Sequence, residues 1–77
     1  MREFEIRLRS VQEVQDFVDL ATTKPFTVLV CDDFRQVNGK SFMEMFCLNL
    51  REPLVASFQC SDEEYQKFCL DANRFLV

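Results

Sequence analysis

Hydrophobic and polar residues alternate strictly over residues 3–9. Phe4, Ile6 and Leu8 occupy every second position, and glutamate or arginine fills the positions between and around them. Successive side chains of a β-strand point to opposite faces of a sheet, so this pattern predicts a strand with one buried and one solvated face.

A helix is predicted to follow this strand. Ser10 ends the alternation and Glu13 comes three residues later, which is the S-x-x-E spacing of a helical capping box. We expect the helix to stop near Thr23, ahead of Pro25. Helical spacing places five apolar residues on its buried face: Val11, Val14, Phe17, Val18 and Ala21.

Three later segments have the composition of strands. Residues 26–31 are apolar and rich in β-branched side chains, and residues 34–37 resume this character after Asp32 and Asp33. We predict a hairpin, because adjacent aspartates between two such segments are typical turn residues and only rarely a metal site. Residues 54–59 alternate again, with Leu54, Ala56 and Phe58 on one face.

Two more S-x-x-E sequences each open a predicted helix. Ser41 with Glu44 begins a short helix that runs to about Leu48, and Ser61 with Glu64 begins the last helix. The apolar residues of the last helix at helical spacing are Tyr65, Phe68, Cys69, Ala72, Phe75 and Leu76. The predicted order of elements is β-α-β-β-α-β-α.

This order favours an α+β fold of two layers, in which three helices cover one face of a four-stranded antiparallel sheet. With 77 residues the chain is expected to form a single domain spanning residues 1–77. The charged residues of the strands would lie on the uncovered face of the sheet. The pattern alone leaves the order of the strands open.

The charge distribution bears on the class of partner. Acidic residues outnumber basic ones 13 to 9, and the formal net charge is −4. The cations are scattered along the sequence, so a nucleic acid is a poor candidate partner, because it is bound largely by clustered lysine and arginine. No apolar run approaches the roughly 20 residues that cross a bilayer, and no signal peptide is recognisable. We expect a cytoplasmic protein without membrane contact.

The sequence has no histidine. This excludes imidazole-assisted nucleophiles, histidine metal ligands and phosphohistidine transfer within the chain. The four cysteines, Cys31, Cys47, Cys60 and Cys69, lie in or beside apolar segments and form no C-x-x-C pair. Reduced thiols are expected there, with zinc binding or a disulfide as the alternatives. We therefore expect no catalytic residues, no metal and no cofactor, and the protein is not predicted to be an enzyme.

Two segments resemble HPr, the histidine-containing phosphocarrier protein of the bacterial sugar phosphotransferase system. Residues 17–21 read F-V-D-L-A, similar to the F-V-x-x-A stretch in the first helix of that family. Residues 37–43 read V-N-G-K-S-F-M, similar to its V-N-[AG]-K-S-[IL]-[ML] run. The two segments align without a gap between them, and weaker similarity extends from Phe4 to Leu76. The resemblance implies an open-faced β-sandwich with sheet order 1-4-2-3.

The phosphocarrier motif of the family, G-L-H-A-R-P, is missing. Counting back from Phe17, the histidine position falls on Ser10, the arginine position on Gln12 and the proline position on Glu13. A serine hydroxyl is a weak nucleophile near neutral pH, and a glutamate repels a phosphoryl donor. Phosphocarrier activity through this site is therefore not expected.

The resemblance also points to Ser41. In many Gram-positive members, a serine at this place is phosphorylated by a dedicated kinase, and the phosphoserine form then binds a transcriptional repressor. The catabolite-repression HPr-like protein has likewise lost the histidine and kept this serine. The alternative is that Ser41 serves only as a helix cap with Glu44. Phe42 and Met43 match positions that the family presents to its partners, and Phe46 extends this candidate contact surface.

The leading hypothesis is therefore a non-catalytic, HPr-like regulatory or partner-binding module that is switched by phosphorylation of Ser41. Its expected partners are proteins, namely a kinase acting on Ser41 and a transcriptional regulator, and its expected state is a monomer or weak homodimer. The alternative hypothesis is a structural or self-associating domain of the same fold with no phosphorylation role. In that case Phe42 and Met43 would lie in the interface between two copies.

Overall fold

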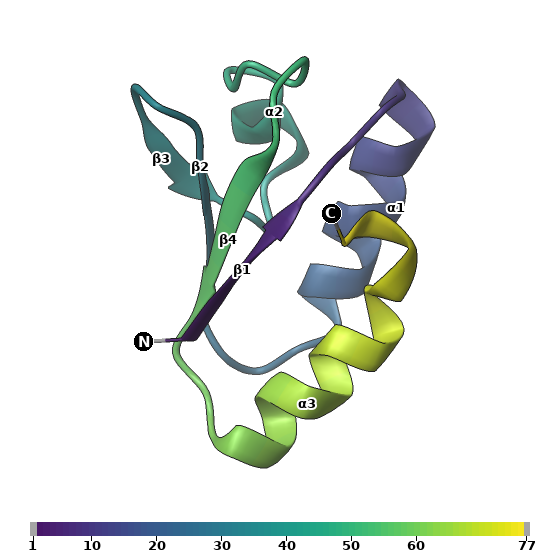
Figure 1. Cartoon of the computed structure of the whole chain (residues 1–77), viewed down its shortest axis with the longest axis vertical. Coiled ribbons are helices and arrows are strands. Elements are labelled where there is room, and N and C mark those ends of the chain that lie inside the picture. Colours follow the sequence, from purple (N-terminus) through teal and green to yellow (C-terminus); the bar gives the residue numbers. More distant parts are fainter. Residues whose placement is uncertain (1, 77) are drawn as a thin grey trace.

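The computed structural model describes residues 2–76, which form four strands, three α-helices and one short 3₁₀-helix. In chain order these are β1 (Arg2–Ile6), α1 (Val11–Thr22), β2 (Val28–Cys31), β3 (Gln36–Asn38), α2 (Phe42–Met45), β4 (Leu54–Phe58), α3 (Asp62–Asp71) and η1 (Asn73–Phe75). Figure 1 shows α1 and α3 packed side by side against one face of the sheet. The predicted order of elements is confirmed.

The sheet is antiparallel throughout and has the order β1-β4-β2-β3. This is the order that the resemblance to HPr implied and that the residue pattern alone had left open. Strand β4 lies between β1 and β2, so that Ala56 pairs with Phe4 on one side and with Val30 on the other. Leu54, Ala56 and Phe58 all point into the core, as their alternation predicted.

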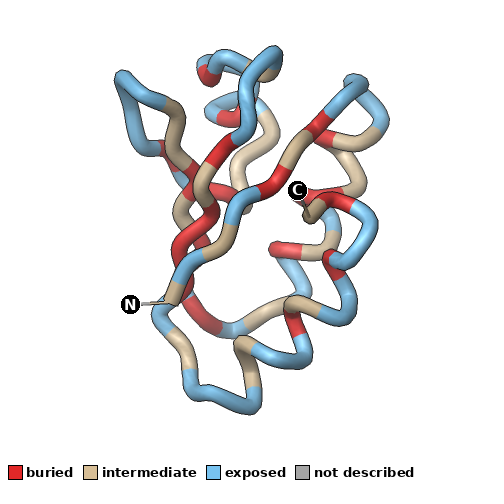
Figure 2. The backbone as a smooth tube through the Cα atoms, viewed as in Figure 1, coloured by how far each residue is buried: buried red, intermediate tan, exposed pale blue. Residues whose placement is uncertain are grey.

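The core is built around the ring of Phe68, which is fully buried on α3. Its centroid lies 4.7 Å from that of Phe58 on β4, 6.0 Å from that of Phe26 and 6.2 Å from that of Phe17 on α1. These separations fall in the range in which aromatic pairs attract one another beyond simple burial. Figure 2 shows that the buried residues of strands and helices face each other across this interior.

The strands are shorter than predicted at their ends. Strand β1 stops at Ile6 instead of residue 9, because the amide of Arg7 donates to the carbonyl of Phe75 at 2.7 Å and leaves the sheet ladder. Leu8 nevertheless remains buried. In the hairpin, β3 begins at Gln36, and Phe34 lies in the turn with 86% of its surface exposed.

Two helix predictions also need correction. Val11 was placed on the buried face of α1, but it is 64% exposed, because it is the first helical residue and nothing covers that end. The last helix was expected to run through to Leu76, but α3 ends at Asp71. A 3₁₀ turn then carries Phe75 into the core, where its ring packs 5.7 Å from that of Phe17. The short second helix likewise ends earlier than predicted, at Met45.

The position of Phe68 predicts a large effect of its truncation. Phe68→Ala should lower the free energy of unfolding by about 3–5 kcal/mol, because it removes a buried ring and leaves a cavity between sheet and helices. Leu70→Ala on the same helix is the matched control: Leu70 is 78% exposed and its change should cost less than about 0.5 kcal/mol. Urea unfolding measures both, and equal losses would contradict the central place given to Phe68.

Candidate functional site

Ser41 is the N-cap of α2. Its backbone is extended (φ −108°, ψ 110°), and its Oγ accepts a hydrogen bond from the amide of Glu44 at 3.3 Å. Its own amide donates to the carbonyl of Asn38 at 3.0 Å, which attaches the start of the helix to the end of β3. The residue is half-buried and its hydroxyl lies at the surface. A modification of the hydroxyl would disrupt one hydrogen bond, that from the amide of Glu44.

The charges around Ser41 are already engaged. The carboxylate of Glu44 accepts a hydrogen bond from the amide of Asn38 at 3.2 Å. In a full capping box it would accept from the amide of Ser41 instead, so Ser41 and Glu44 form only half of the predicted capping box. The ammonium of Lys40, next to Ser41 in sequence, donates to the carbonyl of Lys24 at 2.6 Å. A negative charge placed on Ser41 would therefore meet a fixed carboxylate, while the nearest ammonium is held elsewhere.

The apolar side chains of the α2 region divide between core and surface. Met45 is fully buried, whereas Met43 is 79% exposed and Phe46 is 40% exposed. Phe42 is half-buried and packs edge-on against Phe46, with ring centroids 4.8 Å apart. We call Phe42, Met43 and Phe46 the α2 patch. Met43 and Phe46 supply its accessible surface, and the ring of Phe42 packs against that of Phe46.

Ser10, which the resemblance to HPr aligns with the phosphohistidine of that family, caps α1. Its Oγ accepts from the amide of Glu13 at 3.1 Å, and the residue is exposed. The carboxylate of Glu13 accepts from the amide of Arg9 at 2.8 Å. Gln12, at the arginine position of the family, uses its side-chain amide to donate to Asp16 at 2.9 Å. These groups stabilise the helix start and provide no nucleophile.

The sequence analysis missed a cluster of arginines beside Ser10. Arg7, Arg9 and Arg51 line a shallow pocket of about 370 Å³ together with four other residues, namely Leu8, Ser10, Val11 and Leu50. The guanidinium of Arg7 donates to the backbone carbonyl of Arg51 at 3.2 Å. Arg51 is 44 residues away from Arg7 in the chain, so no local pattern could have placed it beside Arg7 and Arg9.

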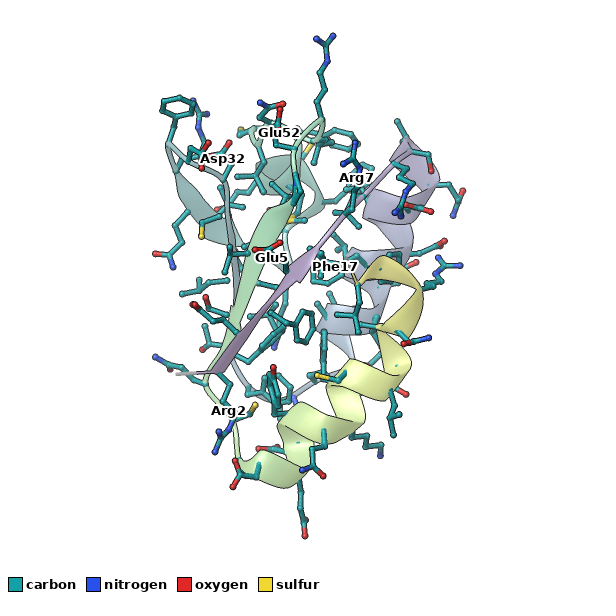
Figure 3. All side chains as sticks on the ribbon, in the orientation of Figure 1. Arg2, Glu5, Arg7, Phe17, Asp32 and Glu52 are labelled. Carbon is teal, nitrogen blue, oxygen red and sulfur yellow. The ribbon has the colours of Figure 1, made fainter. Side chains whose placement is uncertain are left out.

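Asp32 joins the hairpin to the loop that follows α2. One carboxylate oxygen accepts from the amides of Phe34 and Arg35, both at 2.8 Å, and the other accepts from the amide of Asn49 at 2.9 Å. These hydrogen bonds, led by that from Asn49, hold the pKa of Asp32 below its usual value. Figure 3 shows Asp32 at the same end of the molecule as Arg7 and Glu52. Asp32 is thus a turn residue that also fixes a loop.

The remaining reactive groups show no catalytic arrangement within residues 2–76. Cys31, Cys47, Cys60 and Cys69 are free thiols, and burial raises the pKa of Cys60, which disfavours its nucleophilic thiolate form. No group of three or more metal-ligating side chains is found among the described residues. Over the same span, no helix combines the length and apolar character needed to cross a membrane.

Comparisons with known proteins identify the fold. No family model matches the sequence, and no curated protein sequence matches it either. Among solved structures, the chain is similar to HPr-C-His from Thermoanaerobacter tengcongensis, with a TM-score of 0.75 and 25% sequence identity. The match covers 94% of this chain and 90% of that one. The chain therefore has the fold of an HPr, and the similarity supports the resemblance that the two sequence segments indicated.

The hydrogen bonds of Asp32 predict an acid-dependent loss of stability. Because its folded pKa is lower than its unfolded pKa of about 3.9, Asp32 stabilises the fold above that value, and the contribution is lost as pH falls through the folded pKa. Asp32→Asn should melt at a lower temperature than wild type at pH 7 and lose less stability on acidification. Asp33→Asn is the matched control, and an equal pH response of both variants would contradict this role.

Proposed function

We propose that this chain is a non-catalytic, HPr-like regulatory or partner-binding protein that transfers no phosphoryl group through histidine. The fold suggests a protein of the phosphocarrier type. The single observation that carries the proposal is that the chain has this fold and contains no histidine. The protein would then act through contacts with other proteins.

The surroundings of Ser10 support the loss of carrier activity. A neutral hydroxyl needs an adjacent base to become nucleophilic, and the nearby carboxylate of Glu13 is bound to the amide of Arg9. That carboxylate would also repel an incoming phosphoryl group. The amide side chain of Gln12 cannot replace the charge of an arginine in holding phosphate. Ser10 is explained by its capping hydrogen bond.

Ser41 is the candidate switch. It lies in the segment that resembles the family most closely, its hydroxyl is at the surface, and the residue stands directly before the α2 patch. A phosphate on Oγ would place about two negative charges beside the carboxylate of Glu44. Because that carboxylate is held by Asn38, the repulsion would act on the start of α2 and change how Met43 and Phe46 are presented.

The α2 patch is the proposed partner-contact surface. Met43 and Phe46 are exposed apolar side chains three residues apart, and methionine adapts readily to different partner shapes. A protein kinase acting on Ser41 and a transcriptional regulator are the partners that the proposal implies. The same exposed residues also favour the alternative, in which two copies of the chain associate through α2.

Phosphorylation tests the switch. Purified protein incubated with ATP and a Gram-positive HPr kinase should gain the mass of one phosphate, measured by intact mass spectrometry. Ser41→Ala should gain none, whereas Ser61→Ala, which removes another N-cap serine, should still gain it. No gain by the wild-type protein, or a gain by Ser41→Ala, would leave Ser41 as a helix cap worth about 1 kcal/mol.

Sedimentation tests the alternative. A docking surface for another protein should leave the chain monomeric across a concentration series, because the α2 patch is then free. A dimer that is dissolved by Met43→Glu would instead favour self-association through α2. Leu70→Glu introduces the same charge at an exposed apolar position on α3 and should not change the result in either case.

A further inference from the structure

Helices α1 and α3 pack against one face of the sheet, and among residues 2–76 the opposite face carries no helix (Figure 1). The pairing of the four strands places the side chains of this uncovered face in two rows that cross the sheet. One row consists of Glu3, Ser57, Leu29 and Asn38, and the other consists of Glu5, Val55, Cys31 and Gln36. The side chains that alternate with them along the strands point into the core.

The centre of the uncovered face is apolar. Leu29 and Cys31 on β2 and Val55 on β4 are only half-buried, because neighbouring strands flank them while no helix lies over them. The sequence analysis placed charged residues on this face, but in the two rows β1 alone supplies them. The two inner strands therefore present an apolar stripe where a fully solvated face would be polar.

The β1 side of this face is acidic. Glu3 and Glu5 are exposed, and neither carboxylate belongs to an ion pair within residues 2–76. None of the side chains in the two rows is basic. Arg7, which follows β1, and Lys40, which comes after β3, both donate to backbone carbonyls. The two carboxylates are thus available to cations of a partner.

The spacing of these groups fits an α-helix. Glu3 and Glu5 are two residues apart on a strand, a separation of about 7 Å, and helical residues four positions apart are separated by about 6 Å along the axis. The apolar stripe begins on β4, which is next to β1 and about 5 Å away. A helix about 10 Å wide that lies over β4 and β2 would therefore reach the carboxylates with its flank.

A second copy of this chain fits the face less well than a basic partner. It would bring the same carboxylates, and two chains that each carry a net charge of −4 repel one another. A basic segment is attracted by the whole chain and is directed to the β1 side by Glu3 and Glu5.

We propose that the uncovered face of the sheet binds a basic amphipathic helix of another protein, with its lysines or arginines against Glu3 and Glu5 and its apolar side chains against Leu29, Cys31 and Val55. The strands alone form this face. The proposal depends neither on the phosphorylation of Ser41 nor on the α2 patch.

The test uses a synthetic helical peptide in which leucines line one face and lysines flank it. A control peptide has the same composition in an order that leaves neither residue type on one face. Fluorescence anisotropy measures the affinity of the intact protein for each peptide, and amide chemical shifts of the isotope-labelled protein locate the contact. We expect the amphipathic peptide to bind at least about tenfold more tightly, with shift changes at residues 3–5, 29–31 and 55–57.

Charge variants separate the two carboxylates from overall electrostatics. Glu3→Gln with Glu5→Gln should weaken the affinity by about tenfold, because two charge-assisted contacts are lost. Both residues are exposed, so the fold should be retained. The control is Asp33→Asn with Glu63→Gln, which removes the same charge from exposed positions outside this face and should change the affinity by less than about twofold.

A second pair of variants tests the apolar stripe. Val55→Thr keeps the shape and the strand preference of the residue but places a hydroxyl in the stripe, and it should weaken the affinity by about fivefold. Val11→Thr makes the same change at a residue of α1 that is 64% exposed, and it should leave the affinity unchanged.

Four results would overturn the proposal. They are no binding of the amphipathic peptide, equal binding of the control peptide, equal weakening by the two charge variants, and shift changes confined to residues outside the uncovered face. Shift changes at residues 29–31 and 55–57 that grow with protein concentration, without any peptide, would reject an external helix in favour of a second copy. The phosphorylation of Ser41 is measured separately, so neither test decides the other.

Discussion

The packing of Phe68 between sheet and helices is the interaction on which the rest of the structure depends. Its ring lies against Phe58 of β4 and against Phe17 of α1, so one side chain connects the two layers. With α3 held in this way, the 3₁₀ turn that follows brings Phe75 back to the end of β1. The carbonyl of Phe75 then accepts a hydrogen bond from the amide of Arg7, and β1 ends there. The path of the chain after β1 therefore depends on this contact.

A polar contact positions the loop that follows α2. Asp32 binds the amides of its own turn and also that of Asn49, which connects the hairpin to the loop after α2. That loop carries Leu50 and Arg51 to the pocket beside Ser10. Two different contacts therefore hold this end of the molecule, the aromatic packing of Phe68 and the hydrogen bonds of Asp32.

The start of α1 is built from capping hydrogen bonds. Ser10 accepts from the amide of Glu13, and the carboxylate of Glu13 accepts from the amide of Arg9. This N-cap stabilises α1 by about 1 kcal/mol.

The order of the elements, the three serine caps and the inward faces of the strands could all be predicted from the amino-acid sequence. Each of these depends on interactions between residues two to four positions apart, such as Ser41 with Glu44, and these are visible in a single chain. It also determined the absence of any imidazole chemistry.

The ends of the strands, the exposed side chains of α2 and the contact of Arg7 with Arg51 could not be predicted, because they depend on how distant segments pack. Residues 7 and 51 approach because β1 pairs with β4, and residues 7 and 75 because α3 folds back over the sheet. Such contacts join residues that are far apart in the sequence, and no local pattern predicts them. The spacing of residues predicts a face or a cap, whereas a pocket exists only once distant segments have been packed together.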